Sequence, residues 1–293
     1  MSPYEASGIP AQMYAVYSGF ALVFGLLVGS FLNVCIARMP EDRSVVHPPS
    51  HCPSCGHGIR PTDNIPVLSW LLLRGKCRDC GATISSLYPT IELLTGVVAW
   101  LLFRRILPEP SHLDLAHGAA FVFTFSIAAM MIAQSFIDLK HYIIPDEFSI
   151  YAVPYAVAAA FGLTWLGYPE ALSWRESVLG AFFGGGVLLS IAMFWKLVRR
   201  IDSMGMGDVK LLALIGAVLG PWPALPFVMF GSVFLALFIA LPIGFLKTRR
   251  LNFALPFGPF LGLASILWML HGTELADLYY PGWREVSQVF FGM

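Results

Sequence analysis

Two aspartates stand out because each lies where a long apolar stretch meets polar residues. Asp208 follows two glycines, Gly205 and Gly207, and directly precedes an apolar run. Asp138 ends a second apolar run. A carboxylate at the end of a segment that could enter a membrane is costly to keep there, and such a residue is typical of a functional site. We therefore interpret Asp138 and Asp208 as a functional pair.

Two carboxylates at a membrane surface could hydrolyse a peptide bond. One carboxylate would accept a proton from water while the other, protonated, would polarise the scissile carbonyl. Carboxylates that lie close together share a proton, because two like charges cannot both form readily. On this hypothesis Asp138 and Asp208 are the catalytic residues of an aspartyl protease.

Residue type alone leaves other roles open for these aspartates. Asp208 precedes an apolar run and could cap the N-terminus of a helix, and either aspartate could pair with Lys140 or Lys210. The pair could also line an ion or proton pathway, as in transporters. Asp146 is a third candidate, and its position before the next apolar run favours an N-cap.

The composition is that of a polytopic membrane protein. The 293 residues are 57% hydrophobic and 12% charged, with a mean hydropathy of +0.71, whereas soluble domains have about 25% charged residues. The formal net charge is zero, which gives no indication of a nucleic-acid partner. Eight apolar runs predict an all-α fold of about eight transmembrane helices in a lipid bilayer: residues 14–37, 88–103, 116–137, 150–167, 178–198, 209–219, 224–246 and 253–270.

Two of these runs need comment. The first has no Lys or Arg before Arg38, so we interpret it as a retained helix rather than a secretory signal. The sixth has about 11 residues against the ~20 that span a bilayer. It could extend past Pro221 or be shielded by protein, and Pro221 and Pro223 favour a tight hairpin between the sixth and seventh runs.

The basic residues predict the orientation in the membrane. With eight spans, most of the 18 Lys and Arg residues fall on one side, and the other side holds Arg104, Arg105, Arg175 and Arg284. Cytoplasmic connections carry an excess of Lys and Arg. We therefore expect both aspartates and the connection at residues 39–87 in the cytoplasm, with both termini on the opposite side.

Residues 39–87 form a polar connection that is too long to be a plain loop. It contains two CxxC pairs, whose spacing is typical of a tetrahedral zinc site that closes a small fold with little core. Such a closed site is structural rather than catalytic. The predicted ligands are Cys52, Cys55, Cys77 and Cys80.

Other interpretations of the cysteines are weaker. The two pairs could form disulfides or be inert thiols, but structural disulfides are rare in the cytoplasm. His51 or His57 could replace one cysteine as a ligand, although four cysteines already complete a site. Cys35 lies in the first apolar run, where we expect it to be a packed side chain.

Several different short motifs follow one another along nearly the whole chain. Together they resemble the motifs of the type IV prepilin peptidases, which are membrane aspartyl proteases with a Gly-x-Gly-Asp motif. Besides the two CxxC pairs, they are Gly29-Ser30-Phe31-Leu32-Asn33-Val34 with Arg38-Met39-Pro40, Asp63-Asn64-Ile65-Pro66-Val67-Leu68-Ser69-Trp70, Tyr88-Pro89 with Glu92-Leu93-Leu94-Thr95-Gly96, Asp138 to Asp146, Gly205-Met206-Gly207-Asp208-Val209-Lys210, and Pro256-Phe257-Gly258-Pro259-Phe260.

The resemblance implies a place and a reaction. Asp138 and Asp208 would cleave the leaders of prepilins and of the pseudopilins of type II secretion after a Gly. Cleavage would occur on the cytoplasmic side of the bacterial inner membrane, with both termini periplasmic. The chain would divide into a first transmembrane helix at residues 1–38, a cytoplasmic four-cysteine zinc module at 39–87 and a membrane aspartyl protease domain at 88–293.

The resemblance also implies a second activity, N-methylation of the new N-terminus with S-adenosylmethionine. Glu92 and Gly96 would be its candidate residues, although Gly96 could instead allow close helix packing, and no Rossmann-type methyltransferase fingerprint is present. The alternatives are a leader peptidase without methylation, and a transporter or receptor with a zinc-stapled cytoplasmic domain.

Overall fold

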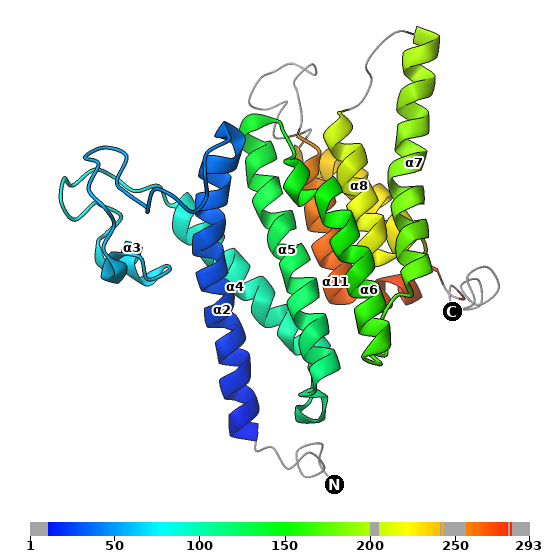
Figure 1. Ribbon diagram of the computed structural model, residues 1–293, viewed down its shortest axis with the longest axis horizontal. Helices are drawn as coiled ribbons and strands as arrows, with labels where there is room; N and C mark the ends of the chain where they lie inside the picture. The colour runs from blue at the N-terminus through cyan, green and yellow to red at the C-terminus, as the bar shows by residue number, and fades with distance from the viewer. Residues whose placement is uncertain (1–10, 200–204, 241, 243–255, 281, 283–293) are drawn as a thin grey trace. The chain divides into compact units, whose positions relative to one another are not determined.

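The computed structural model describes residues 11–199, 205–240, 242, 256–280 and 282. Over these ranges the chain is helical and forms no strand longer than the isolated bridges His51–Gly58 and Lys76–Thr83. The chain, drawn with its helices labelled in Figure 1, divides into two compact units, Met1–Ala133 and Gln134–Met293. The predicted all-α fold class is therefore confirmed.

Each of the eight predicted apolar runs overlaps a described helix. The helices are α2 (Ala11–Arg38), α4 (Leu87–Ile106), α5 (Leu115–His141), α6 (Val153–Trp165), α7 (Trp174–Arg199), α8 (Met206–Leu219), α9 (Ala224–Leu235) with a π-helical continuation at Ala236–Ala240, and α11 (Gly258–Tyr279). Between α2 and α4 lies the short helix α3 (Leu68–Leu72). Short 3-10 turns at Met39–Glu41, Pro61–Asp63, Pro110–His112, Asp146–Phe148 and Ile150–Ala152 complete the described elements.

Five described helical segments are long and apolar enough to cross a membrane. They are Met13–Glu41, Leu87–Ile106, Leu115–His141, Asp146–Trp165 and Trp174–Val198, and Ala224–Ile239 is a shorter apolar segment. These segments support a multi-pass membrane protein. The count of eight spans stays a prediction, as does the sidedness. Several parts of the chain on which these predictions rest lie outside the described residues: both termini, residues 200–204, and the basic residues Lys247, Arg249, Arg250 and Arg284.

In the first unit, α2 and α4 pack against each other through small residues. A Cβ on Gly25 would lie 2.5 Å from Ala99 Cβ, and one on Gly29 would lie 2.7 Å from Glu92 Cα. Small residues allow membrane helices to approach backbone to backbone. Cys35 is buried on α2, as predicted for a packed side chain.

In the second unit, α7 and α8 make an equally close contact. Gly180 faces the Gly216 carbonyl and Gly184 faces the Leu212 carbonyl so closely that neither could carry a Cβ. The hydroxyl of Ser177 donates to the Ala217 carbonyl oxygen at 2.7 Å. These contacts hold α8 against the first half of α7.

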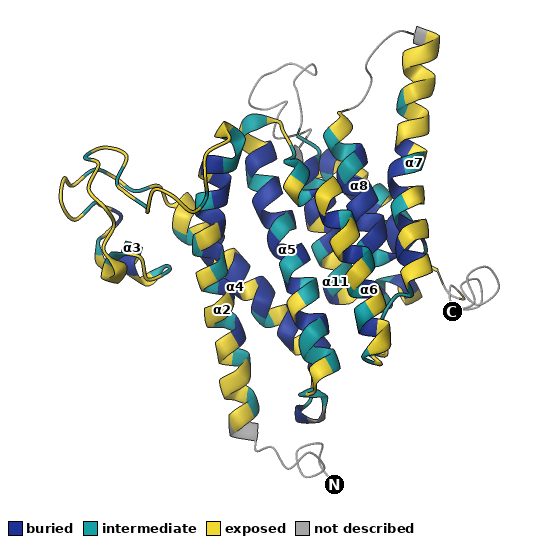
Figure 2. Ribbon diagram, viewed as in Figure 1, coloured by how far each residue is buried: buried dark blue, intermediate teal, exposed yellow. Residues whose placement is uncertain are grey.

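The sixth predicted span is short because protein surrounds it. The 14 residues of α8 rise about 21 Å, which is less than the ~30 Å hydrocarbon core. Most side chains from Val209 to Ala217 are buried (Figure 2). The helix ends at Leu219, so it does not extend past Pro221, and a turn with Gly220 at φ 83° leads into α9. The short connection agrees with the predicted hairpin between the two runs.

Residues 39–87 have little regular structure. Apart from short turns, α3 is their only described helix, with five residues. Figure 2 shows that much of this segment is exposed. Such a segment needs a metal or ion pairs to hold it, because it buries too little apolar surface.

Candidate active site and metal centre

Asp138 is held at the start of α11. It lies near the end of α5, its residue is 5% exposed, and its Oδ2 accepts the backbone N–H of Gly258 at 2.9 Å. The first N–H groups of a helix have no partner within the helix, and the helix dipole favours a negative charge there. This contact orients one oxygen of the Asp138 carboxylate across 120 residues of sequence.

A side chain at position 258 would crowd this contact. A Cβ at this position would lie 2.7 Å from Asp138 Oδ2 and 2.9 Å from Gln134 Oε1. Real Cβ atoms essentially never come within 3.0 Å of another heavy atom. The predicted last-span motif, residues 256–260, therefore has a structural reason for its central glycine.

Gln134 is a contributor that sequence reasoning missed. Its residue is 0% exposed, and its Nε2 donates to the Gly258 carbonyl oxygen at 3.2 Å. Its Oε1 is buried and has no hydrogen-bond partner within the described residues. One signal was present: Gln134 is a polar residue in an apolar run, four positions before Asp138 and thus on the same helix face.

Asp208 lies in the first turn of α8, which begins at Met206 after the N-cap Gly205. No side chain caps this helix, so the hypothesis that Asp208 is an N-cap was wrong. Asp208 is half-buried, and its carboxylate interacts electrostatically with that of Asp138. The two predicted aspartates therefore lie near enough for their charges to interact, and their catalytic role stays a prediction.

Asp146 has a different partner. Its Oδ1 accepts a hydrogen bond from Lys210 Nζ at 2.7 Å. It begins a 3-10 turn whose N-cap is Pro145, so the predicted N-cap role for Asp146 was wrong. Because Lys210 is engaged with Asp146, the lysine next to the Gly-x-Gly-Asp motif joins α8 to the segment that follows α5.

The two glycines before Asp208 are not equivalent. A Cβ on Gly207 would lie 3.2 Å from Ile144 Cβ, which is tighter than most real contacts. Among the described residues, which do not include 200–204, a Cβ on Gly205 would meet only Asp208 Oδ2, at 3.6 Å. Gly207 therefore allows α8 to approach the residue 143–146 segment, whereas Gly205 makes no comparably close contact with a described residue.

The four predicted cysteines come together as one cluster. Their sulfur atoms all lie within 4.8 Å of one another, and Cys52 Sγ lies 3.9 Å from Cys80 Sγ. A zinc ion with Zn–S bonds of ~2.3 Å requires sulfur atoms about 3.8 Å apart. All four are free thiols, so the disulfide alternative is not supported. His51 and His57 are not in the cluster.

The two CxxC pairs have the same local structure. The Cys52 N–H donates to the His57 carbonyl oxygen at 2.9 Å, and the Cys77 N–H donates to the Ala82 carbonyl oxygen at 2.8 Å. Each pair is followed by a glycine with positive φ, Gly56 at 73° and Gly81 at 72°. Glycine adopts this conformation without steric cost, so each pair forms a tight knuckle that directs two sulfurs to one side.

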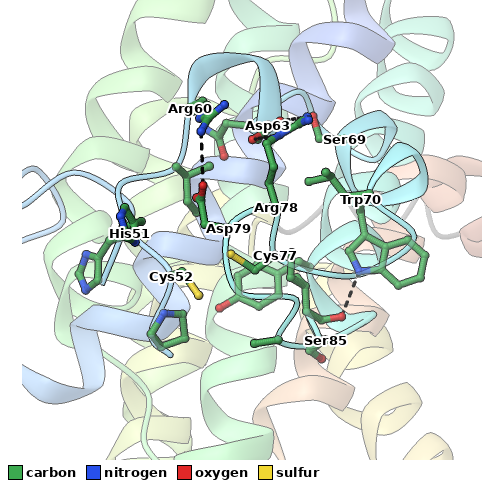
Figure 3. Close-up of a pocket in the computed structure, with 18 of the residues that line it drawn as sticks. His51, Cys52, Arg60, Asp63, Ser69, Trp70, Cys77, Arg78, Asp79 and Ser85 are labelled. Carbon is green, nitrogen blue, oxygen red and sulfur yellow. Dashed lines mark hydrogen bonds and ion pairs between the residues drawn. The ribbon is translucent and has the colours of Figure 1, made fainter. Parts of the chain in front are cut away.

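An ion pair joins the second knuckle to the preceding turn (Figure 3). Arg78 donates from Nε and Nη2 to Asp63, at 2.8 and 2.6 Å. The Arg78 guanidinium lowers the pKa of the Asp63 carboxyl below its usual range. Arg60 and Asp79 form a second, exposed pair at 3.3 Å. These pairs hold the chain around the cysteine cluster.

The two methyltransferase candidates lie in different surroundings. Glu92 is on α4, and its Oε2 accepts the Val67 N–H at 2.6 Å. It lines a cavity of about 360 Å³ whose other walls come from residues 51–89. A Cβ on Gly96 would instead lie 2.8 Å from Leu26 Cδ2 on α2. Gly96 is thus at the helix contact, as the packing alternative expects.

Comparisons with known proteins cover both units. A model described as the type IV leader peptidase family matches residues 125–241. A second, described as the bacterial peptidase A24 N-terminal domain, matches residues 23–106. The first match contains Asp138 and Asp208, and the second contains the cysteine cluster and Glu92.

Curated relatives match over most of the chain. The prepilin leader peptidase/N-methyltransferase of Dichelobacter nodosus is 36% identical, over 89% of this chain and 95% of its own length. The protein of the same name from Aeromonas hydrophila is 34% identical, over 90% and 94% respectively. That of Myxococcus xanthus is 38% identical, over 75% of this chain and 61% of its own length. No solved structure matches the chain significantly.

Proposed function

The chain belongs to the type IV leader peptidase family, and we propose that it cleaves the leaders of prepilins and pseudopilins and then N-methylates the new N-terminus. The cleavage half is supported by two carboxylates, Asp138 and Asp208, that lie near enough for their charges to repel each other. The curated relatives are named for both activities, which supports the methylation half.

The two carboxylates would divide the chemistry of hydrolysis. Asp138 has one oxygen fixed by the Gly258 N–H, whereas Asp208 is only half-buried. One carboxylate would take a proton from the attacking water while the other, protonated, would donate a hydrogen bond to the scissile carbonyl. Because the two interact, they would titrate as a pair rather than separately.

The substrate would approach from the cytoplasmic side of the inner membrane. The bias of Lys and Arg toward one set of connections supports this side for both aspartates and for residues 39–87, and favours a periplasmic location for both termini. A Gly before the scissile bond would let the substrate backbone extend toward Asp138 and Asp208. The proposed protease domain comprises residues 88–293.

The cysteine cluster would hold a structural zinc ion. The donor set fits: four thiols at tetrahedral spacing with no fifth ligand in the cluster. Bound zinc would close residues 39–87, a zinc module with little core of its own. The closed set of ligands leaves no position for water, so it would take no part in hydrolysis.

Mass spectrometry of a model prepilin tests both halves of the proposal. The purified protein in detergent, incubated with the substrate and S-adenosylmethionine, should give a product without its leader and heavier by one methyl group. A product that lacks the leader but carries no added methyl group would refute the proposed methylation and leave the proposed cleavage standing. An untouched substrate in the presence of folded protein would return the aspartates to the transporter interpretation.

A further inference from the structure

Gln134 stands beside the aspartate pair with its acceptor oxygen unused. Its residue is 0% exposed, and its Nε2 donates to Ser135 Oγ and to the Gly258 carbonyl oxygen, both at 3.2 Å. Its Oε1 is buried and accepts no hydrogen bond from a described residue. An amide oxygen that is removed from water is costly to leave without a donor. The buried Oε1 therefore calls for a donor that the other contacts do not supply.

The contacts of the amide determine where this oxygen points. Nε2 faces the Gly258 carbonyl, and turning the amide over would place two acceptors against each other. A Cβ on residue 258 would lie 2.9 Å from Gln134 Oε1 and 2.7 Å from Asp138 Oδ2, so the two oxygens border the same point. Gln134 and Asp138 are also four residues apart on α5 and share a helix face.

A protonated Asp138 would supply the missing donor. The Gly258 N–H is already directed at Asp138 Oδ2, at 2.9 Å. A carboxylate has no hydrogen to give, whereas a carboxylic acid has one O–H and keeps lone pairs that can still accept that N–H. We propose that Gln134 Oε1 accepts the O–H of Asp138 in the resting protein, so that the proton shared by the two aspartates stays on Asp138 and Asp208 acts as the base. The inference rests on the proposed cleavage.

Burial favours the same division between the two carboxylates. Asp138 is 5% exposed, whereas Asp208 is half-buried, and an ionised carboxylate loses more solvation the deeper it is buried. The Gly258 N–H at the start of α11 acts in the other direction, because it favours the ionised form of Asp138. Gln134 Oε1 opposes that N–H, since it can accept a hydrogen bond but cannot donate one.

Gln134 offers the same kind of acceptor as the substrate. A side-chain amide oxygen and the carbonyl oxygen of a peptide bond accept hydrogen bonds in the same way. When the substrate binds, the O–H of Asp138 would turn from Gln134 to the scissile carbonyl, while Asp208 takes a proton from the attacking water. Gln134 would thus keep the proton in place before the reaction, which makes it a positioning residue rather than a catalytic one.

Other titratable groups nearby have to be considered in any measurement of pH dependence. The first turn of α11, residues 258–261, carries none. The described elements around Asp138 hold Asp208 and Lys210 on α8, Asp146 and Glu147 in the turn before α6, and Lys140 and His141 at the end of α5. Lys210 is engaged with Asp146, and Asp208 interacts with Asp138. All of these groups are the same in the parent and in a Gln134 variant, so a difference between the two pH profiles would report on Gln134.

The pH profile of kcat/KM for cleavage of a model prepilin tests the proposal with Gln134→Met. Methionine keeps the length of the side chain but has no amide. Without Oε1 the pair should lose its shared proton more readily, so the alkaline limb should move to lower pH by about 0.5 to 1 pH unit, as one hydrogen bond would give. The acid limb, where Asp208 gains a proton, should stay in place. The shift should be smaller in kcat, because the bound substrate replaces Gln134 as the acceptor.

The two limbs of the profile separate the outcomes. Movement of the acid limb alone would mean that Asp208 holds the shared proton, and would overturn the proposal. Unchanged limbs with a lower rate at every pH would mean that Gln134 only packs α5 against α11, and would overturn it as well. A folded parent protein that cleaves no prepilin at any pH would instead refute the proposed function.

Ser265→Ala is the matched control. Ser265 is also 0% exposed, but its hydroxyl donates to the Leu261 carbonyl oxygen at 2.7 Å, within α11. Its loss should lower the stability of the protein without moving either limb. An equal shift in both variants would mean that loss of any buried polar group changes the profile, and would refute a specific role for Gln134. If Gln134→Met does not fold, Gln134→Leu makes the same test, since leucine favours a helix and also lacks the amide.

Discussion

The zinc module and the aspartate pair hold their functional residues by opposite means. In the module, four partly exposed cysteines gather around one point with little core beneath them, and ion pairs link the chain segments. Asp138 is instead held in place by packed helices, by the buried side chain of Gln134 beside it and by the backbone N–H of Gly258. The first arrangement would depend on a bound metal ion and on charge, whereas the second depends on close packing around the Asp138 carboxylate.

Removing the metal should have the largest effect, and only on the module. Structural zinc contributes about 10–16 kcal/mol to folding in small domains. We expect about one zinc ion per chain and expect Cys77→Ser to lose it. Limited proteolysis should then cut within residues 39–87 while the helical circular dichroism changes little. A folded, active preparation without zinc would show that the cysteines do not bind it.

Adding one methyl group beside Asp138 should abolish most cleavage. A Cβ on Gly258 would lie 2.7 Å from Asp138 Oδ2, so Gly258→Ala must move the carboxylate or the start of α11. A misplacement of ~1 Å can cost about 100-fold in rate. The cleavage rate of a model prepilin measures this.

Gly231→Ala is the control for that change. Gly231 lies in α9, where a Cβ would have ordinary contacts at 3.9 Å. The Gly231→Ala variant should cleave a model prepilin at nearly the rate of the parent protein. Equal rates in Gly258→Ala and the parent would mean that the Asp138 contact with α11 is unimportant for catalysis.

Disturbing the contact between α7 and α8 should reduce cleavage less than the change at Gly258, but it should measurably lower the stability of the protein. Gly180→Ala places a methyl group against the Gly216 carbonyl, and overpacking of this kind typically costs about 1–3 kcal/mol. We expect a lower Tm in detergent. Gly186→Ala, on the same helix with open space around it, should leave the Tm nearly unchanged, and a similar fall in both variants would contradict the close contact.

The smallest effect concerns the Asp63–Arg78 pair. Arg78 lowers the pKa of Asp63 in the folded protein, so the pair stabilises the module above the usual aspartate pKa of ~3.9. This contribution is lost as the pH falls through the lowered pKa. Asp63→Asn should therefore make the module easier to digest at neutral pH, and the difference from the parent should shrink as the pH falls below about 4. A difference that persists in acid would point to shape rather than charge.

Sequence reasoning located most of the fold because the helices are carried by long apolar runs. Each of the eight predicted runs overlaps a described helix, and most side chains of the short sixth run are buried. The cysteine cluster was also predictable, since four identical ligands at regular spacing leave few alternatives. The two aspartates were identified from their positions at the ends of such runs.

The contacts that orient these residues could not be predicted in the same way. Asp138 is held by a backbone N–H 120 residues away, and Glu92 by the N–H of Val67. Nearly every residue type carries the same backbone N–H group, so the sequence does not indicate which N–H will bind a given carboxylate. Gln134 did leave a mark, as a polar residue four positions before Asp138, but its partner Gly258 depends on tertiary packing.

The central claim is that Asp138 and Asp208, rather than Asp146, perform cleavage. The most direct measurement is the single-turnover rate of leader removal by Asp208→Asn and Asp146→Asn, with Asp138→Asn alongside. We predict that Asp138→Asn and Asp208→Asn lose cleavage while remaining folded and membrane-inserted, whereas Asp146→Asn, which loses only its pairing with Lys210, retains most of it. Cleavage near the parent rate by Asp208→Asn, or a greater loss in Asp146→Asn, would contradict the account and move the catalytic role to Asp146.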